Sequence, residues 1–280
     1  MDKVAITIGK FDGFHKGHML LLNRLAELKK KGYHTIVCLI DANRPRILSL
    51  KQQEEAALSN GIDNVRVMKF TPQFAKLSPE EFVKEYLIDE LHASYVVIGN
   101  DFSYGCNRSG NVSVLKELGS KYGFTVESFN KLVIDGNIVS SSLIRDLLSD
   151  GNIKAAEKYL GRKICFTNEV VHGRHLGTGI GFPTLNIYPE ERHMLPRYGV
   201  YKTDVLIDGE RYTGFTNIGV KPTVNGDKAG IETFVLDFNK DVYGSKVSII
   251  LNDFIRPEMK FSNLDELKLQ IRKDIDKIRG

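Results

Sequence analysis

The sequence predicts an α/β domain with a doubly wound parallel sheet, followed by a small antiparallel β-barrel domain with a C-terminal helix. Three observations predict this architecture. Strand-like and helix-like runs alternate through the first half of the 280 residues, strand-like runs then follow one another with little helix between them, and one amphipathic pattern ends the chain. A chain of this length is typically two domains, and we place them over residues 1–160 and 161–280.

Strand and helix patterns alternate along the first domain. The expected strands are rich in β-branched residues and are Val4–Gly9, His34–Ile40, Asn64–Phe70, Tyr95–Gly99 and Phe124–Phe129. The expected helices have apolar residues at helical spacing and are Gly17–Lys31, Lys51–Ser59, Pro79–Leu91, Asn111–Tyr122, Ser142–Leu148 and Ile153–Tyr159. This alternation indicates βαβ units and a sheet covered on both faces. Ligands of such a sheet bind at the carboxyl ends of its strands.

The second domain is predicted to be mostly antiparallel strands. They are Ile164–Val171, Thr184–Ile187, Gly199–Ile207, Glu210–Ile218, Ile231–Phe238 and Lys246–Leu251. Asp208-Gly209 lies between two alternating runs and is a strong hairpin signal. Asn263–Ile278 is expected to form the last helix, with one apolar stripe. Strands in this order favour a small closed barrel.

Composition narrows the function classes. The net charge is only +4 and is divided evenly between the halves, so no basic surface for nucleic acid is expected. No apolar run approaches the roughly 20 residues that span a membrane, and the N-terminus lacks the pattern of a secretory signal. Cys38, Cys106 and Cys165 are odd in number and widely spaced, which argues against a disulfide framework. We expect a cytoplasmic protein whose partners are small molecules.

Two histidines follow the first strand, at the start of a helix. The run is His15-Lys16-Gly17-His18. The pair has the spacing of zinc ligands, but no third ligand is close in sequence. The alternative is phosphate binding, because a helix N-terminus offers unpaired N–H groups and imidazoles donate beside it. Gly9 and Gly17 would let a phosphate approach the main chain; a purely structural role is the other interpretation.

A second polar run lies at the start of a later helix. It is Ser140-Ser141-Ser142-Leu143-Ile144-Arg145. Serine at this position is an ordinary N-cap. Hydroxyl groups with an arginine one turn later are also what would hold a polyphosphate.

These motifs together resemble those of prokaryotic FAD synthetases, in which an FMN adenylyltransferase domain precedes a riboflavin kinase domain. Gly9-Lys10-Phe11-Asp12-Gly13-Phe14-His15-Lys16-Gly17-His18 is similar to the family's GxFDGxHxGH signature. Ser140–Arg145 resembles its SSTxxR motif. The segment Gly99–Gly110, with Asp101, Phe102 and Arg108, looks like its GxDFxFG…RxG run.

The resemblance implies that the phosphate of FMN attacks the α-phosphorus of ATP and that pyrophosphate leaves. His15, His18 and Arg145 would then be catalytic. The nucleotide would contact Gly9, Phe11, Gly17, Ser141, Ser142 and Arg145, and the flavin would contact Asp101 and Phe102. Mg²⁺ is the implied cofactor, with ATP as co-substrate.

A glycine-rich stretch opens the second domain, from His172 to Asn186. Its glycines, which include Gly177 and Gly181, fit neither the dinucleotide-binding spacing nor a Walker A loop. One remaining interpretation is a flap whose main-chain N–H groups bind phosphate. The alternative interpretation is a mobile hairpin.

This stretch resembles the riboflavin kinase pattern VxHGxxxGRxLGFPTAN. The resemblance implies a nucleotide site at Gly173, Gly177, Gly181, Thr184 and Asn186, with Thr184 and Asn186 also holding Mg²⁺. Ile218–Thr223 is similar to the family's IGxRPT run, and Glu232 stands at the position of its catalytic Glu. Glu232 would take the proton of the riboflavin hydroxyl that attacks the γ-phosphorus of ATP. Arg256 begins a run that resembles the flavin-proximal LRxExKF.

The chain departs from the family pattern at several positions. Asp41–Pro45 stands where a DPHP-like run is usual, and Asn100 replaces an aromatic residue. In the kinase half Thr178 replaces an Arg, Leu185 a small Ala, and Phe234 a His. Our leading hypothesis is an enzyme that makes FMN and then FAD from riboflavin. Two alternatives are an adenylyltransferase whose kinase domain is weak or only binds flavin, and a non-catalytic flavin or nucleotide sensor.

Overall fold

The computed structural model describes residues 3–173, 182–223 and 226–279. The chain divides into two compact units, Met1–Ser141 and Ser142–Gly280, each of which is described by itself. Within the described ranges, no helix is both long enough and apolar enough to cross a membrane.

The first unit is built on a five-stranded parallel sheet in the order β3-β2-β1-β4-β5. The strands are β1 (Val4–Gly9), β2 (His34–Asp41), β3 (Asn64–Lys69), β4 (Ala93–Gly99) and β5 (Thr125–Phe129). Every neighbouring pair is parallel. The prediction of a parallel sheet is therefore confirmed, and the carboxyl ends of β2, β1 and β4 lie side by side at its centre.

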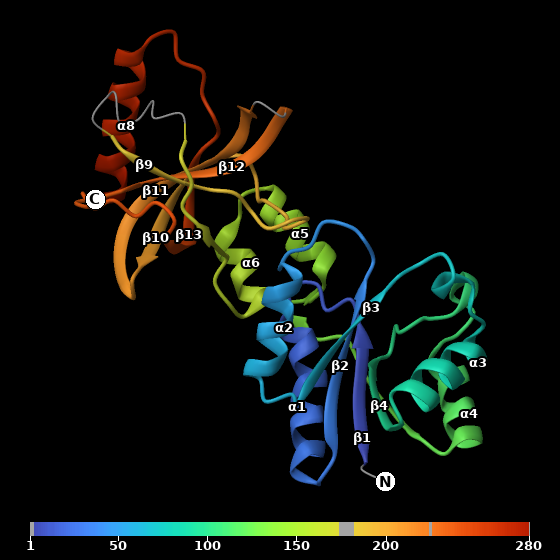
Figure 1. The fold of residues 1–280 in the computed structure, drawn as a ribbon. Coiled ribbons are helices and arrows are strands. Elements are labelled where there is room, and N and C mark those ends of the chain that lie inside the picture. Colours follow the sequence, from blue (N-terminus) through green and yellow to red (C-terminus); the bar gives the residue numbers. More distant parts are fainter. Residues whose placement is uncertain (1–2, 174–181, 224–225, 280) are drawn as a thin grey trace. The chain divides into compact units, whose positions relative to one another are not determined.

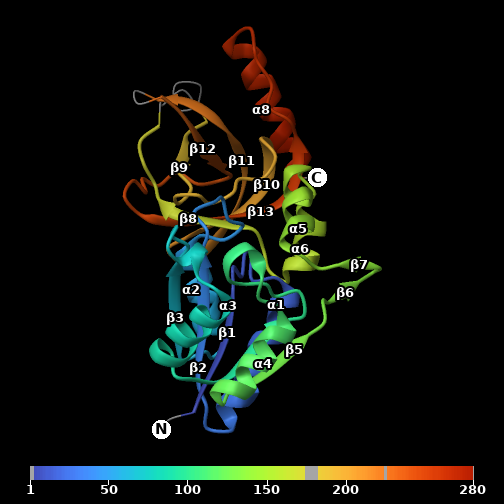
Figure 2. The same cartoon turned by 90° about the vertical axis from the view of Figure 1, so that its right-hand side faces the viewer.

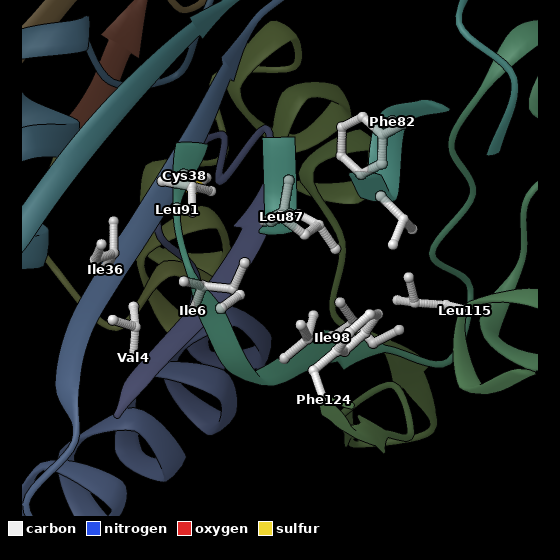
Figure 3. Packing of buried hydrophobic residues seen from close by; sticks show 14 of the residues in the cluster. Val4, Ile6, Ile36, Cys38, Phe82, Leu87, Leu91, Ile98, Leu115 and Phe124 are labelled. Carbon is white, nitrogen blue, oxygen red and sulfur yellow. The ribbon is translucent and has the colours of Figure 1, made fainter. Parts of the chain in front are cut away.

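Helices cover both faces of this sheet (Figure 1). They are α1 (Lys16–Lys30), α2 (Leu50–Ser59), α3 (Pro79–Phe82) and α4 (Val112–Tyr122). One apolar cluster lies under α1 and α2 and includes Leu25 and Val37. The other includes Ile98 and Leu115, and Figure 3 shows its side chains packed together. Continuous apolar strands such as VAITIG reflect this burial on both faces.

Two features of this unit differ from the expected elements. The helix predicted over Pro79–Leu91 begins as α3 and continues as a π-helix over Val83–Glu90. A short hairpin, β6 (Val133–Ile134) and β7 (Asn137–Ile138), follows β5 and was not expected. Its turn residues Asp135 and Gly136 have φ of 49° and 77°, the left-handed values that tight hairpin turns require.

Two helices join the sheets. They are α5 (Ser141–Ser149) and α6 (Ile153–Leu160). The main-chain N–H of Arg197 donates to the carbonyl of Leu148, and Lys154 forms an ion pair with Asp253 at 2.6 Å. Both helices therefore pack within the second unit, ahead of the predicted domain boundary at residue 160.

The second unit is a six-stranded antiparallel sheet in the order β8-β13-β10-β11-β12-β9. The strands are β8 (Cys165–Glu169), β9 (Thr184–Ile187), β10 (Gly199–Ile207), β11 (Glu210–Thr223), β12 (Gly226–Val235) and β13 (Lys246–Arg256). The sheet curls strongly (Figure 2). The expected small barrel is confirmed, and its two edges approach through a bridge between Val171 and Asn186.

Buried threonines link three strands of this barrel, and the C-terminal helix packs against it through apolar side chains. Fully buried Thr203, Thr216 and Thr233 link β10, β11 and β12 by hydroxyl contacts of 3.0 and 2.8 Å, which fixes the strand register. The C-terminal helix α8 (Leu264–Arg279) places an apolar stripe that includes Ile278 against Val200 and Phe215. The predicted helix is confirmed, and Ile271, Ile275 and Ile278 of its apolar stripe are packed in this cluster, whereas Leu264 of the stripe is 55% exposed.

Candidate active sites

The loop between β1 and α1 is held in a strained conformation. Phe11 and Phe14 have φ of 43° and 44°, a region that costs a non-glycine residue about 1 kcal/mol or more. Asp12 lies between them and is buried. Its Oδ1 accepts a hydrogen bond from the N–H of Ile47 at 2.7 Å, and its carbonyl accepts one from the Ser141 hydroxyl at 2.9 Å. These bonds bring the Ser141 motif and the histidine motif together.

His15 and His18 stack on each other at the start of α1. Their ring centroids are 3.6 Å apart and the planes differ by 14°. His15 is the N-cap of α1, and its Nδ1 accepts the main-chain N–H of His18 at 3.3 Å. This bond leaves Nε2 of His15 as the protonated nitrogen. The side chain therefore presents an N–H donor away from its own helix.

Burial lowers the pKa of both histidines. The pKa of His15 falls to about 4 because burial disfavours the charged ring, while the nearby Asp12 carboxylate opposes that effect. Burial lowers the pKa of His18 well below its ordinary value, and the His15 charge adds to this. Nδ1 of His18 is buried and has no hydrogen-bond partner among the described residues. The lowered pKa values favour the uncharged form of both rings at neutral pH.

Gly17 and Phe11 support the histidine pair. A Cβ on Gly17 would lie 3.1 Å from Nδ1 of His15, so the glycine makes room for that ring. A Cβ on Gly9 would lie 3.2 Å from the Phe11 ring. Phe11 is buried, and its ring centroid lies 5.0 Å from that of His18. Two of the predicted nucleotide-site glycines thus also serve the packing of the loop.

The predicted SSSLIR motif is divided between the two units: Ser140 and Ser141 belong to the first, and Ser142 to Arg145 belong to the second. The unit boundary falls between Ser141 and Ser142. Nη1 of Arg145 lies 3.6 Å from Sδ of Met194 in that unit. Of this motif, the structure places Ser141 in direct contact with the histidine loop.

The predicted flavin residues of the first domain follow the end of β4. The Asp101 carboxylate forms an ion pair with Lys131 at 3.0 Å. Phe102 stacks on Tyr104 with centroids 5.4 Å apart. Burial raises the pKa of Tyr104 to about 12, and its buried hydroxyl has no partner in the described part of the chain. An apolar wall with one O–H donor therefore lies at the carboxyl end of β4.

Sequence reasoning missed a group of positive charges at the same edge of the sheet. Lys10 follows β1, Arg44 follows β2, and Arg108 lies in the segment after β4. Partial burial and the charges of Arg44 and Arg108 lower the pKa of Lys10, while Asp12 raises it. The signal was present in the sequence, since each residue follows a strand that ends at this edge.

In the second unit, Glu232 lies at the meeting point of three strands. The hydroxyl of Thr184 on β9 donates to Oε1 of Glu232 on β12 at 2.6 Å. Glu232 stands opposite Asn186 of β9 and opposite Asn217 of β11 in the strand register. The structure therefore brings Glu232 together with Thr184 and Asn186, which the sequence predicted from a different motif.

The glycine-rich stretch from His172 to Asn186 is described only in part. Gly177, Gly181 and the departure Thr178 lie outside the described residues. Gly173 is described, and a Cβ there would lie 2.4 Å from Nδ2 of Asn186. Gly173 is thus required for the position of the Asn186 side chain, which is itself buried.

Arg256 was predicted to contact flavin, and the structure engages its guanidinium elsewhere. Nε and Nη2 donate to the Asp274 carboxylate at 3.0 and 2.7 Å. Asp274 lies on α8, is 2% exposed, and also accepts from Gln270. Nη1 donates to the carbonyl of Pro257. The Arg256–Asp274 ion pair links α8 to the end of β13. Contact between Arg256 and flavin stays a prediction.

The carboxylate of Glu258, which the sequence analysis did not single out, lies beside Asn217 and Gly219 of β11. Oε1 of Glu258 accepts from Nδ2 of Asn217 at 3.4 Å. A Cβ on Gly219 would lie 1.9 Å from the same oxygen. Two signals were available: Glu258 lies in the run that begins at Arg256 and resembles LRxExKF, and Gly219 lies in the Ile218–Thr223 run at a position where only glycine leaves this space.

Oxygen atoms dominate the polar groups around Glu232. Thr184 supplies a hydroxyl, Asn186 an amide and Glu232 a carboxylate, which are the donor types that Mg²⁺ prefers. Within the described residues, no group of three or more His, Cys, Asp or Glu side chains is placed to hold a metal ion. A metal at this site would therefore depend on phosphate oxygens of the nucleotide as well.

Family models match both units. A model described as FAD synthetase matches residues 1–143, and one described as riboflavin kinase matches residues 160–280.

Individual proteins match along nearly the whole chain. The bifunctional riboflavin kinase/FMN adenylyltransferase of Escherichia coli K12 is 35% identical, over 96% of this chain and 90% of its own length. The protein of the same name from Pseudomonas fluorescens is 36% identical, over 98% of this chain and 91% of its own. A crystal structure titled as a macrolide-efflux protein from Streptococcus pneumoniae has a TM-score of 0.87 and 29% identity, covering 100% of this chain and 94% of that one.

Proposed function

The chain belongs to the family of bifunctional riboflavin kinase/FMN adenylyltransferases, and from this premise we propose how its two sites make FAD. The second unit phosphorylates riboflavin to FMN, and the first joins FMN to the AMP part of ATP. The observation that carries the proposal is the pairing of a stacked His15–His18 donor site in one unit with a Thr184–Glu232 site in the other. We keep residue 160 as the functional boundary, where the kinase match begins.

In the first unit, a phosphate oxygen of FMN attacks the α-phosphorus of ATP. The bond from that phosphorus to the bridging oxygen breaks, and pyrophosphate leaves. Nε2 of His15 donates to a phosphate oxygen, and the first N–H groups of α1 add their partial positive charge. Negative charge beside the rings raises the histidine pKa values, so both groups can be protonated as the triphosphate binds.

Other groups of the first unit position the substrates. The Ser141 hydroxyl adjoins the histidine loop through the Asp12 carbonyl, and we assign it to the nucleotide together with Ser142 and Arg145. Phe102 and Tyr104 offer a flat apolar surface for the flavin ring, and Asp101 lies beside them. No covalent enzyme intermediate is required, so catalysis consists of positioning and charge stabilisation.

In the second unit, Glu232 accepts the proton of the ribityl hydroxyl as its oxygen attacks the γ-phosphorus of ATP, and ADP leaves. The hydroxyl of Thr184 orients the carboxylate before substrate arrives. Thr184 and Asn186 would hold Mg²⁺, which when bound neutralises charge on the ATP phosphates. We assign Gly173, Gly177 and Gly181 to the nucleotide.

We place the enzyme in the cytoplasm. In the part of the chain that the structure describes, no disulfide involves Cys38, Cys106 or Cys165, which suits a reducing compartment.

One assay tests the proposal. Purified protein receives ATP and Mg²⁺ with riboflavin or with FMN, and the products are separated by chromatography. When riboflavin is supplied, we expect FMN and ADP as products. When FMN is supplied, we expect FAD and pyrophosphate. FAD formed from FMN without any FMN formed from riboflavin would favour an adenylyltransferase with a flavin-binding second unit, for which Phe234 at the family's usual His position is the motivating observation. No product from either flavin would refute the proposal.

A further inference from the structure

Three cations gather at the carboxyl edge of the parallel sheet, one after each of its three central strands. Lys10 directly follows β1, Arg44 comes soon after the end of β2, and Arg108 lies in the segment that follows β4. Strands β2, β1 and β4 are adjacent and parallel, so their carboxyl ends point the same way. The topology thus brings together three residues that are far apart in the sequence.

The acidic residues of these loops already have other partners. Asp41 forms an ion pair with Arg46, which is buried. Asp101 is paired with Lys131. The Asp12 carboxylate accepts from the N–H of Ile47. In the described part of the chain, none of the three cations has a carboxylate within ion-pair distance.

Keeping like charges together costs free energy in the empty protein. Arg44 and Arg108 lower the pKa of Lys10 by repulsion, and partial burial adds to this, with only Asp12 acting in the opposite direction. The backbone beside both arginines is also strained, since Asn43, Asn107 and Arg108 have φ of 48°, 53° and 57°. Such an arrangement is stabilised by a bound anion.

The surroundings indicate which anion. Arg108 lies in a loop closed by the bridge between Tyr104 and Gly110, whose main-chain bonds are 3.0 and 2.9 Å long. The same loop carries the stacked Phe102–Tyr104 pair that we assign to the flavin ring. Cations beside a flavin surface suit the phosphate of a phosphorylated flavin.

We propose that Lys10, Arg44 and Arg108 form the binding site for the terminal phosphate of FMN in the first unit. This inference rests on the proposed function. The three cations neutralise a dianion that must approach the negatively charged triphosphate, and they make the site select FMN over riboflavin.

Arg44→Gln tests the proposal, because Arg44 is exposed and its loss should not affect folding. Steady-state FAD formation should show a KM for FMN raised about 10- to 100-fold, the effect of losing one charge-assisted hydrogen bond, with the KM for ATP within about twofold of wild type. Arg44→Lys should restore most of the affinity. Lys30→Gln is the matched control, since Lys30 is an exposed cation in the last turn of α1.

A binding experiment without turnover separates this proposal from the proposed function. Flavin fluorescence titrations compare FMN with riboflavin in wild type and in Arg44→Gln. The wild type should bind FMN more tightly than riboflavin at one of its sites, and the variant should lose that preference. An unchanged preference, or an increase in the KM for ATP in place of FMN, would overturn the assignment. If the wild type forms no FAD but shows the Arg44-dependent preference for FMN, the proposed FAD synthesis would be refuted and the proposed phosphate site would be supported.

Discussion

The two proposed activities, one in each unit, rely on side chains of different chemistry. In the proposed mechanism, His15 and His18 are hydrogen-bond donors at the start of α1, where burial lowers the pKa of both rings. Glu232 is the proposed proton acceptor, and its carboxylate accepts a hydrogen bond from the Thr184 hydroxyl. Substitutions at these residues should therefore separate the two activities.

Glu232→Gln should abolish FMN formation and spare FAD formation. The amide keeps an oxygen that can accept the Thr184 hydroxyl, but it cannot take a proton. We expect kcat of the kinase reaction to fall by about 10²- to 10⁴-fold, with KM for riboflavin little changed. Product analysis with riboflavin and with FMN measures both. A kinase kcat near that of the wild type would exclude Glu232 as the base.

The histidine pair should titrate well below the ordinary range. Because the pKa of His15 is about 4 in the folded protein and about 6.5 in the unfolded chain, the unfolded state binds more protons between these values. His15 therefore opposes folding as the pH falls from about 6.5 to 4, by up to roughly 3 kcal/mol at the acid end.

NMR titration of the histidine Cε1–H signals, assigned with His15→Gln, measures these pKa values. We expect the His15 signal to hold its neutral shift down to about pH 5. Addition of ATP should move its midpoint upward, because the phosphate charge favours the protonated ring. A midpoint near 6.5 without nucleotide would contradict the buried, uncharged pair.

Much of what sequence predicts at the residue level concerns local motifs. The histidine loop and Ser141 were predicted from separate runs, and Asp12 joins them in the structure. The contact that Arg256 makes has no such local motif. Its partner Asp274 lies on a different element, and no local pattern reveals that the two meet.

Individual elements were predictable where their pattern is local. The strand Val4–Gly9 and the N-cap Ser78 with its capping-box partner Glu81 appear as expected. Strands β11 and β13 extend further than predicted, to Thr223 and Arg256, because pairing with β12 and β10 continues the ladder beyond the apolar runs. The π-helical turns of Val83–Glu90 have no signal in the apolar spacing.

The C-terminal helix depends on the Arg256–Asp274 pair. Asp274→Asn should destabilise the second unit by about 3 kcal/mol, because it leaves a partly buried guanidinium without its counter-charge. Denaturant unfolding measures the loss, and hydrogen exchange should show faster exchange in Leu264–Arg279. Asp276→Asn, an exposed neighbour on the same helix, should change neither quantity. Equal exchange in both variants would mean that the pair does not hold α8.

At the scale of the whole molecule, each unit has its own sheet, core and reactive groups. The alternation of strands and helices and its end near residue 160 predicted this division. The residue at which the packing changes units depends on α5 and α6, which contact the second unit through the Leu148 carbonyl and the Lys154 side chain. A main-chain carbonyl and an exposed lysine make these contacts, and neither is visible in apolar periodicity.

Two defective proteins should therefore complement each other. His18→Ala alone should stop at FMN when supplied with riboflavin, and Glu232→Gln alone should make neither product. An equal mixture should form FAD after a lag, during which FMN released by the first protein accumulates and reaches the second. Chromatography at successive times follows both products. A mixture that makes FMN but never FAD would show that FMN does not pass through solvent.

The anchoring of Asp12 makes the chain unequally tolerant of change at the three positions involved. Position 47 contributes a main-chain N–H, which any residue except proline can supply, but its side chain is buried, so in a randomised library we expect apolar residues there. Position 141 contributes a hydroxyl, which confines the choice to serine and its homologue threonine. Position 12 must supply a short side chain with a hydrogen-bond acceptor, and the backbone of both neighbouring residues has the positive φ of the left-handed region. Each of the three positions is thus limited for a different reason, although all three serve one loop.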